Sequence, residues 1–273
     1  MKTGIIIKSV GPEIEKKIAD AAALGFKSCQ INGFDSELFT DEMAERIVSA
    51  LKQHGMELSA FWCGWRGPQE WNFYGGQKTL GIVPEEYRED RVVDLLRGAD
   101  FTKKLGAKNM VTHVGFIPEN PYDENYEPTV NAVRKIAERC KENGINFLFE
   151  TGQETPVTIL RVIEDVGLDN LGVNLDPANL ILYGKANPID ALDVIGKFVI
   201  DVHAKDGLYP TDGKSLGKET PIGAGKVDFP RFVARLREIG YDGPLTIERE
   251  ISGEQQIKDI IAAKKYLEEL IAR

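Results

Sequence analysis

Histidine and cysteine are both scarce in this sequence, which holds three of each among its 273 residues. Cys29, Cys63 and Cys140 lie far apart and form no CxxC pair, and their odd number argues against a complete disulfide framework. An excess of positive charge is also missing, since the formal net charge is −9. Nucleic-acid backbones and anionic membranes are bound by basic surfaces, so we expect neither as a partner.

Long hydrophobic runs are absent as well. The first residues, MKTGIIIKSVGPEIEKK, contain one short apolar run followed by charges, which fits neither a signal peptide nor a membrane span. No stretch rich in proline and serine divides the chain, and no segment has low complexity. We therefore expect a reduced, cytoplasmic protein that folds as one domain over residues 1–273.

What the sequence does contain is a regular alternation of two patterns. Short apolar runs, typical of buried parallel strands, are separated by segments with apolar residues at three- and four-residue spacing, typical of helices. The predicted strands are residues 4–9, 28–33, 58–65, 109–116, 145–152, 171–177, 198–206 and 243–250.

Two of the helical segments carry clear end signals. Residues 41–55 begin at a Thr40/Asp41 cap and end at Gly55, and residues 128–144 have Pro128 near the start and Gly144 at the end. Eight strand–helix alternations predict a parallel sheet, and this chain length predicts that the sheet closes into a single (β/α)8 TIM barrel of the α/β class. An open doubly wound sheet is the second choice, disfavoured because no GxGxxG follows the first strand.

Polar residues end four successive predicted strands: Glu150, Asp176, His203 and Glu248. The carboxyl ends of barrel strands form one rim, where active sites of this fold lie. Buried charges persist when they are paired or bind a metal, and an oxygen-rich set favours Mn²⁺, Mg²⁺ or Co²⁺ over a closed structural zinc site. Each carboxylate alone could instead be a salt-bridge partner or a loop cap. Alternation also places Glu250 on the same face as Glu248, so the residues alone leave either as the ligand.

Several motifs resemble the sugar-phosphate isomerase/epimerase superfamily, the xylose-isomerase-like barrels (AP endonuclease 2 family) that include endonuclease IV. The motifs are FLFE, NLDPAN, DVHAKD, PIGAGKVDF and GYDGPLTIERE, and the resemblance covers essentially the whole chain. It implies that Glu150, Asp176, His203 and Glu248 are the metal ligands, with Mn²⁺ the expected ion and Zn²⁺ a further alternative. It also implies that the two glutamates are the acid/base pair. Ketose 3-epimerases of this family usually have a histidine where this chain has Asn179.

The predicted chemistry starts with proton abstraction next to a metal-chelated carbonyl and hydroxyl pair. Removal and return of the proton on opposite faces, by Glu150 and Glu248, would epimerise a sugar, and transfer to the neighbouring carbon would isomerise it. Loss of a β-substituent would instead make the enzyme a dehydratase or lyase acting on keto-sugars, inositols or glycosides. All three reactions share an enediolate intermediate. We therefore predict a metal-dependent sugar isomerase or epimerase, with the dehydratase or lyase as the alternative.

Further residues near the strand ends are candidates for binding the substrate, a sugar or polyol: His113, Lys205, Glu154, Asn179, Trp62 and Asp206. The alternatives are structural, namely a buried histidine at 113, a salt bridge at 154 and a loop cap at 206. Aromatic residues at and after the third strand, including those of the long segment 66–86, could stack on a sugar, close as a lid or form a subunit interface.

Two other functional classes are open. In the family that the chain resembles, an endonuclease IV site holds three zinc ions and needs more histidines than this chain has, and an acidic surface suits DNA poorly. A non-catalytic sugar-binding barrel or accessory subunit is the other class, and the full ligand set argues against it. Homo-oligomers are common in the family, so a homo-oligomer is an open alternative to a monomer.

Overall fold

The computed structural model describes residues 1–273, and its centre is a closed barrel of eight parallel strands. Around the barrel the strands follow the order β1, β10, β7, β6, β5, β4, β3 and β2. Their bounds are β1 (Lys2–Ile7), β2 (Ser28–Gly33), β3 (Glu57–Cys63), β4 (Asn109–Thr112), β5 (Asn146–Glu150), β6 (Leu171–Leu175), β7 (Val199–Ala204) and β10 (Pro244–Ile247). Each predicted strand overlaps one of them, so the prediction of a (β/α)8 barrel is confirmed.

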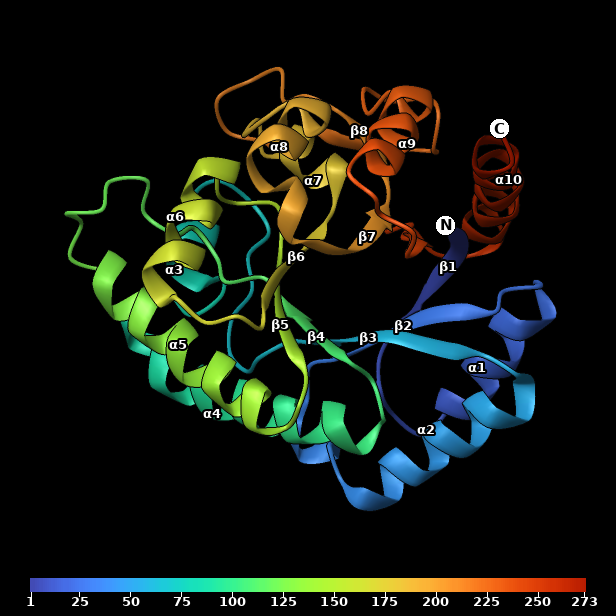
Figure 1. Ribbon diagram of the computed structural model, residues 1–273, viewed down its shortest axis with the longest axis horizontal. Coiled ribbons are helices and arrows are strands. Elements are labelled where there is room, and N and C mark those ends of the chain that lie inside the picture. The colour runs from blue at the N-terminus through green and yellow to red at the C-terminus, as the bar shows by residue number, and fades with distance from the viewer.

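Helices surround the barrel, and α10 packs beside β1, where the two ends of the chain come close together (Figure 1). The helices are α1 (Ile14–Ala23), α2 (Asp41–His54), α3 (Gly76–Thr79), α4 (Glu85–Lys104), α5 (Tyr126–Glu142), α6 (Pro156–Val166), α7 (Pro177–Leu182), α8 (Pro188–Ile195), α9 (Phe229–Glu238) and α10 (Glu254–Ile271). Two short 3-10 helices cover Ser36–Leu38 and Gly196–Phe198. None of the helices is both long enough and apolar enough to cross a membrane.

The predicted ends of α2 are confirmed. The Thr40 hydroxyl accepts the Met43 N–H at 3.2 Å, and Gly55 adopts a left-handed φ of 60° that ends the helix. Met43, Ile47 and Leu51 are buried along one face of α2 and pack against the strands. The helix is therefore placed by its end signals and held by its apolar face.

The barrel wall divides the hydrophobic core into two parts. A cluster of 66 buried residues fills the layer between the strands and the helices. A second cluster of 8 buried residues includes Ala60, Trp62, Val111 and Leu148, which alternate with outward-facing residues of β3, β4 and β5. The inner surface of the barrel is thus apolar on the side formed by these three strands.

A small antiparallel hairpin, absent from the sequence prediction, follows β7. Its strands are β8 (Asp206–Leu208) and β9 (Lys218–Thr220). The segment 221–227 then folds back onto Asp206, whose carboxylate accepts four backbone N–H groups, those of Gly207, Gly223, Gly225 and Val227, at 2.9, 2.9, 3.0 and 3.1 Å. A Cβ atom at Gly225 would lie 2.1 Å from Asp206 Oδ1, so this close approach requires glycine.

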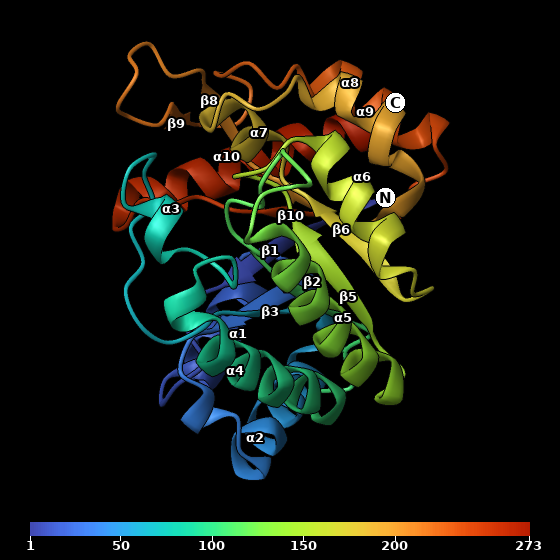
Figure 2. The same ribbon diagram turned by 90° about the vertical axis from the view of Figure 1, so that its left-hand side faces the viewer.

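A buried arginine orders the long segment between β3 and α4. Arg91 of α4 is fully buried, and its guanidinium donates to four backbone carbonyl oxygens, those of Arg66, Pro68, Thr79 and Gly81, at 3.1, 2.9, 2.7 and 2.6 Å. The segment includes α3, which lies on the same side of the barrel as the β8–β9 hairpin (Figure 2). One side chain therefore ties together the connection that was predicted as a candidate lid.

Candidate metal centre

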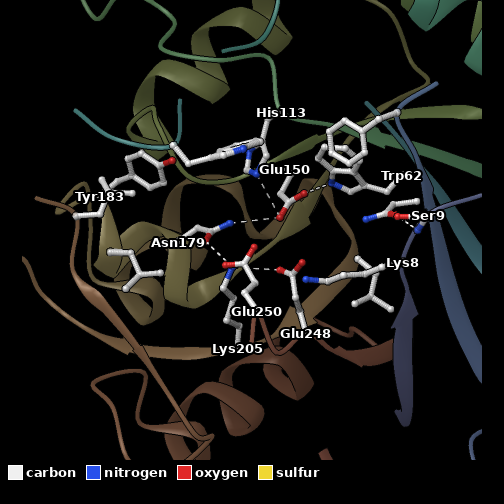
Figure 3. Close-up of a pocket in the computed structure, with 16 residues that line it drawn as sticks. Lys8, Ser9, Trp62, His113, Glu150, Asn179, Tyr183, Lys205, Glu248 and Glu250 are labelled. Carbon is white, nitrogen blue, oxygen red and sulfur yellow. Dashed lines mark hydrogen bonds and ion pairs between the residues drawn. The ribbon is translucent and has the colours of Figure 1, made fainter. Parts of the chain in front are cut away.

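The carboxyl ends of the strands surround a pocket of about 270 Å³ (Figure 3). Active sites of (β/α)8 barrels lie at this end of the strands. The pocket joins a charged cluster to aromatic walls. Its charged and aromatic lining residues are Lys8, Glu150, Lys205, Glu248, Glu250, Phe34, Trp62, Trp71, His113 and Tyr183.

Four side chains from neighbouring strand ends meet beside this pocket, and two of them, Glu150 and Glu248, line it. Glu150 is the last residue of β5, Asp176 follows β6, His203 lies in β7 and Glu248 follows β10. One ligand atom from each lies within 4.8 Å of the others, and all four residues are buried. The structure thus brings together the four residues that were predicted as metal ligands.

The atoms of this cluster fit a divalent cation. His203 Nδ1 lies 3.1 Å from Glu150 Oε1, and 3.7 Å from both Asp176 Oδ2 and Glu248 Oε2. Asp176 Oδ1 caps α7 by accepting the Asn179 N–H, whereas the buried Oδ2 has no hydrogen-bond partner. Three buried carboxylates repel one another unless positive charge lies between them. Carboxylate oxygens with one imidazole nitrogen form a donor set that Mn²⁺ and Mg²⁺ accept.

Glu150 is the most enclosed of the pocket carboxylates. The Trp62 indole N–H donates to its Oε2, Asn179 Nδ2 donates to its Oε1 at 3.3 Å, and His113 Nε2 lies 3.5 Å from the same oxygen. Burial raises the pKa of Glu150, but the charges of His113 and His203 lower it by more than burial raises it, so the pKa falls to about 2. These partners explain how an apolar strand can end in a carboxylate that is ionised at neutral pH.

Glu248 has a different partner, the buried ammonium group of Lys205. Lys205 Nζ donates to Asn179 Oδ1 and to Glu248 Oε2, both at 3.2 Å, and lies 2.7 Å from Glu250 Oε2. Burial alone would lower the pKa of Lys205, but the nearby carboxylates raise it well above its usual value. Burial alone would raise the pKa of Glu248, but Lys205 and His203 hold it below its usual value. All three N–H donors of Lys205 are therefore used by protein acceptors.

Four of the six residues predicted to bind substrate line the pocket, namely Trp62, His113, Asn179 and Lys205. Glu154 and Asp206 do not. Glu154 is fully buried, neither of its carboxylate oxygens has a hydrogen-bond partner, and burial raises its pKa to about 8. The Asp206 carboxylate is occupied by backbone N–H groups, as expected for the loop cap that was its alternative role.

The structure also places residues at the pocket that the sequence analysis missed, above all Lys8. This residue follows β1, and its side chain extends toward Glu248 from the side opposite Lys205 (Figure 3). Unlike Lys205, the Lys8 ammonium has no hydrogen-bond or ion-pair partner in the chain, which leaves its donors free for a ligand. Alternation along the first strand, which puts Ile6 and Lys8 on one face, is the signal that could have identified it.

Two relatives are similar to this chain in sequence. The uncharacterized protein MJ1311 of Methanocaldococcus jannaschii is 28% identical over 179 residues, which are 62% of this chain and 58% of that protein. The match thus spans less than two thirds of the relative's length. The inosose dehydratase of Lacticaseibacillus casei is 22% identical over 221 residues, which are 68% of this chain and 72% of the enzyme.

Solved structures and a family model agree on the fold. A xylose isomerase domain protein from Planctomyces limnophilus is 33% identical, with a TM-score of 0.91 over 98% of this chain and 96% of that one. A D-tagatose 3-epimerase-like protein is 20% identical, with a TM-score of 0.76 over 100% of this chain and 99% of that one. At this identity the likeness shows only that the two chains share a fold. The family model described as xylose isomerase-like TIM barrel matches residues 18–270. The chain therefore belongs to the xylose isomerase-like TIM barrel family.

Proposed function

We propose that this protein is a divalent-metal-dependent isomerase or epimerase of a small sugar or polyol. The observation that carries the proposal is the cluster of Glu150, Asp176, His203 and Glu248, whose ligand atoms lie within 4.8 Å of one another beside the pocket. Lys205 and the histidines compensate part of the charge of the three buried carboxylates, but Asp176 Oδ2 has no hydrogen-bond partner, so the cluster is better explained as a metal site than as structure. The sugar epimerase-like neighbour and the family membership agree with this assignment.

Glu150, Asp176, His203 and Glu248 would hold the ion, with Mn²⁺ as our first choice. When bound, a divalent cation polarises a carbonyl and adjacent hydroxyl of the substrate, which acidifies a neighbouring C–H. Glu150 and Glu248 come from strands that are not neighbours in the barrel, and both line the pocket. They are placed to remove a proton from one side of a substrate carbon and return one from the other, through an enediolate of the substrate.

The pocket walls suit a small polyhydroxylated ligand. Trp62, Trp71 and Tyr183 offer aromatic surfaces for the C–H faces of a sugar. Lys8 offers free N–H donors, whereas those of Lys205 are occupied, so we assign the contact with a substrate oxygen to Lys8. A volume of about 270 Å³ lies just below the usual range for drug-sized ligands, which favours a single sugar ring or an inositol.

A dehydratase or lyase is the second candidate, and Asn179 is the observation that favours it. Asn179 bridges Glu150 and Lys205, at the position where ketose 3-epimerases usually have a histidine. An amide cannot exchange protons with a substrate as an imidazole can. The inosose dehydratase relative carries the same reaction class in its name.

The other classes fit the site less well. The chain has three histidines, and His54 ends α2, away from the pocket, so an endonuclease-type site with three zinc ions lacks ligands. A non-catalytic sugar-binding barrel would not need two carboxylates at the ligand. We also propose a cytoplasmic location and no nucleic-acid or membrane partner, and we leave monomer or homo-oligomer to direct measurement.

The first test is the metal content of the purified protein, grown with manganese, for the wild type and Glu248→Gln. We expect about one Mn²⁺ per chain and less in the variant. Ketoses and keto-inositols would then be screened in heavy water for deuterium uptake at carbon. Loss of a substrate hydroxyl as water would decide for the dehydratase, three zinc ions per chain for the endonuclease, and no metal even after added Mn²⁺ would overturn the proposal.

A further inference from the structure

A buried glutamine links the barrel interior to the metal centre. Gln30 of β2 is fully buried, and its side chain crosses the barrel. Its Oε1 lies 2.9 Å from His203 Nε2, and its Nε2 donates to Asn174 Oδ1 at 3.0 Å. One side chain thus joins β2 to β7 and to β6, which is the strand on the opposite side of the barrel.

The direction of the Gln30 amide follows from its contact with Asn174. The amide nitrogen of Gln30 donates to Asn174 Oδ1, so the amide oxygen is the atom that faces His203 Nε2. An amide oxygen only accepts hydrogen bonds.

This arrangement selects one tautomer of His203. Because the Gln30 oxygen can only accept, Nε2 of the imidazole must carry a proton. The lone pair of the neutral ring is then on Nδ1, the atom nearest the carboxylates of Glu150, Asp176 and Glu248. A lone pair directed at three carboxylates is stable when a cation lies between them.

We propose that Gln30 is a positioning residue of the metal centre, which, held by Asn174, keeps His203 as the Nε2–H tautomer and directs Nδ1 toward the cation. The proposal rests on the metal site of the proposed function and adds Gln30, which belongs to none of the family motifs. Removal of such a partner from a ligating histidine weakens metal binding by roughly 10–100-fold.

The first experiment measures Mn²⁺ affinity of the metal-free protein by calorimetry and by the electron paramagnetic resonance signal of free Mn²⁺. Gln30→Met keeps the side-chain volume but removes the acceptor, and should weaken binding by roughly 10–100-fold. Gln30→Glu keeps an acceptor for Nε2–H and should retain most of the affinity. Gln153→Met, which deletes another buried glutamine amide that makes no hydrogen bond to a proposed ligand, is the matched control and should bind Mn²⁺ as the wild type does.

The second experiment reads the tautomer directly and needs no variant at position 30. The chain has three histidines, so long-range ¹H–¹⁵N spectra of the ¹⁵N-histidine-labelled protein contain three ring patterns. His54→Asn and His113→Asn identify the pattern of His203. With Mg²⁺ bound, His203 should show a protonated Nε2 and an unprotonated Nδ1, and Gln30→Met, where it folds, should mix the two tautomers.

The outcomes separate this proposal from the proposed function. Mn²⁺ binding that Gln30→Met leaves unchanged, or a His203 with its proton on Nδ1 in the Mg²⁺-bound protein, overturns the role of Gln30 and leaves the metal site intact. A wild type that binds no Mn²⁺ overturns both. Thermal unfolding followed by circular dichroism, run on each variant, distinguishes lost affinity from lost folding.

Discussion

The two sides of the barrel interior differ in chemistry. On the side of β3, β4 and β5 the inward residues Ala60, Val111 and Leu148 are apolar and belong to one buried cluster. On the side of β2, β6, β7 and β10 the buried inward positions are polar, and they include Ser28, Gln30, Asn174, Asp201 and Thr246. Both sides are equally shielded from water, so burial does not explain the difference.

The polar residues of the barrel interior are costly to bury, which points to a function for that side. Ser28, Asn174, Asp201 and Thr246 each have a buried side-chain atom without a hydrogen-bond partner in the chain. Each such atom costs about 1–3 kcal/mol, a cost that packing alone would not favour. Three of the four proposed metal ligands, Asp176, His203 and Glu248, come from this side. The apolar side and the outer layer stabilise the barrel, and the polar side supports the site.

The largest effect on activity is expected from a substitution of Glu248, where the polar side of the interior meets the pocket. Glu248→Gln removes a proposed metal ligand that is also one of the two proposed proton-transfer groups, so we expect proton exchange to fall by about 10²–10⁴-fold. Deuterium uptake by the substrate in heavy water measures it. Glu254→Gln, an exposed substitution on α10, is the control, and equal loss in both variants would contradict the assignment of Glu248.

A substitution on the apolar side of the interior should lower the stability of the fold rather than the activity. Leu148→Ala leaves a cavity in the inner cluster, and we expect the free energy of unfolding to fall by about 2–5 kcal/mol. Urea unfolding followed by circular dichroism measures this change. A loss well below 1 kcal/mol would mean that the inner cluster is not tightly packed.

Glu154 should make the free energy of unfolding depend on pH. Its pKa rises from 4.5 to about 8 on burial, so between these values the folded chain binds a proton that the unfolded chain releases. The free energy of unfolding, as far as it depends on Glu154, is therefore highest below pH 4.5. It declines toward pH 8, by up to about 1.4 kcal/mol per pH unit. Urea unfolding from pH 5 to 8 should show a shallower decline for Glu154→Gln than for the wild type, and parallel curves would contradict the assignment.

The smallest effect is expected from a matched pair of threonines. The buried hydroxyl of Thr246 has no partner, so Thr246→Val should change the free energy of unfolding by less than about 1 kcal/mol, or raise it. The Thr112 hydroxyl donates to the Cys63 carbonyl at 2.7 Å, so Thr112→Val should cost about 1–3 kcal/mol. Equal effects in the two variants would mean that water satisfies Thr246.

Much of this protein could be predicted from local patterns. The strands follow from apolar runs bounded by turn residues, and the ends of α2 follow from Thr40 and Gly55. The four candidate ligands could be grouped because parallel strands of a barrel end on one rim, and the family resemblance decided for Glu248 over Glu250. Lys8 could have been found in the same way, from alternation along β1.

The roles of other residues could not be read from the sequence. Asp206 looks like a pocket residue in DVHAKD, but its carboxylate is occupied by backbone groups of residues 223–227, which approach only after the chain folds back. Lys205 lies at the pocket, yet its donors are occupied by Asn179, Glu248 and Glu250. Which polar group is free depends on distances between segments that no local pattern contains.

By itself, the sequence determined the barrel and the identity of the residues at its rim, because periodicity and strand order are local and repeat eight times. Only the tertiary structure decided which of those residues are occupied and which are free. It alone paired Gln30 with His203, because that contact spans 173 positions in the chain and crosses the interior of a closed barrel. Closure places strands from distant parts of the sequence face to face, and the chemistry of the site depends on those contacts.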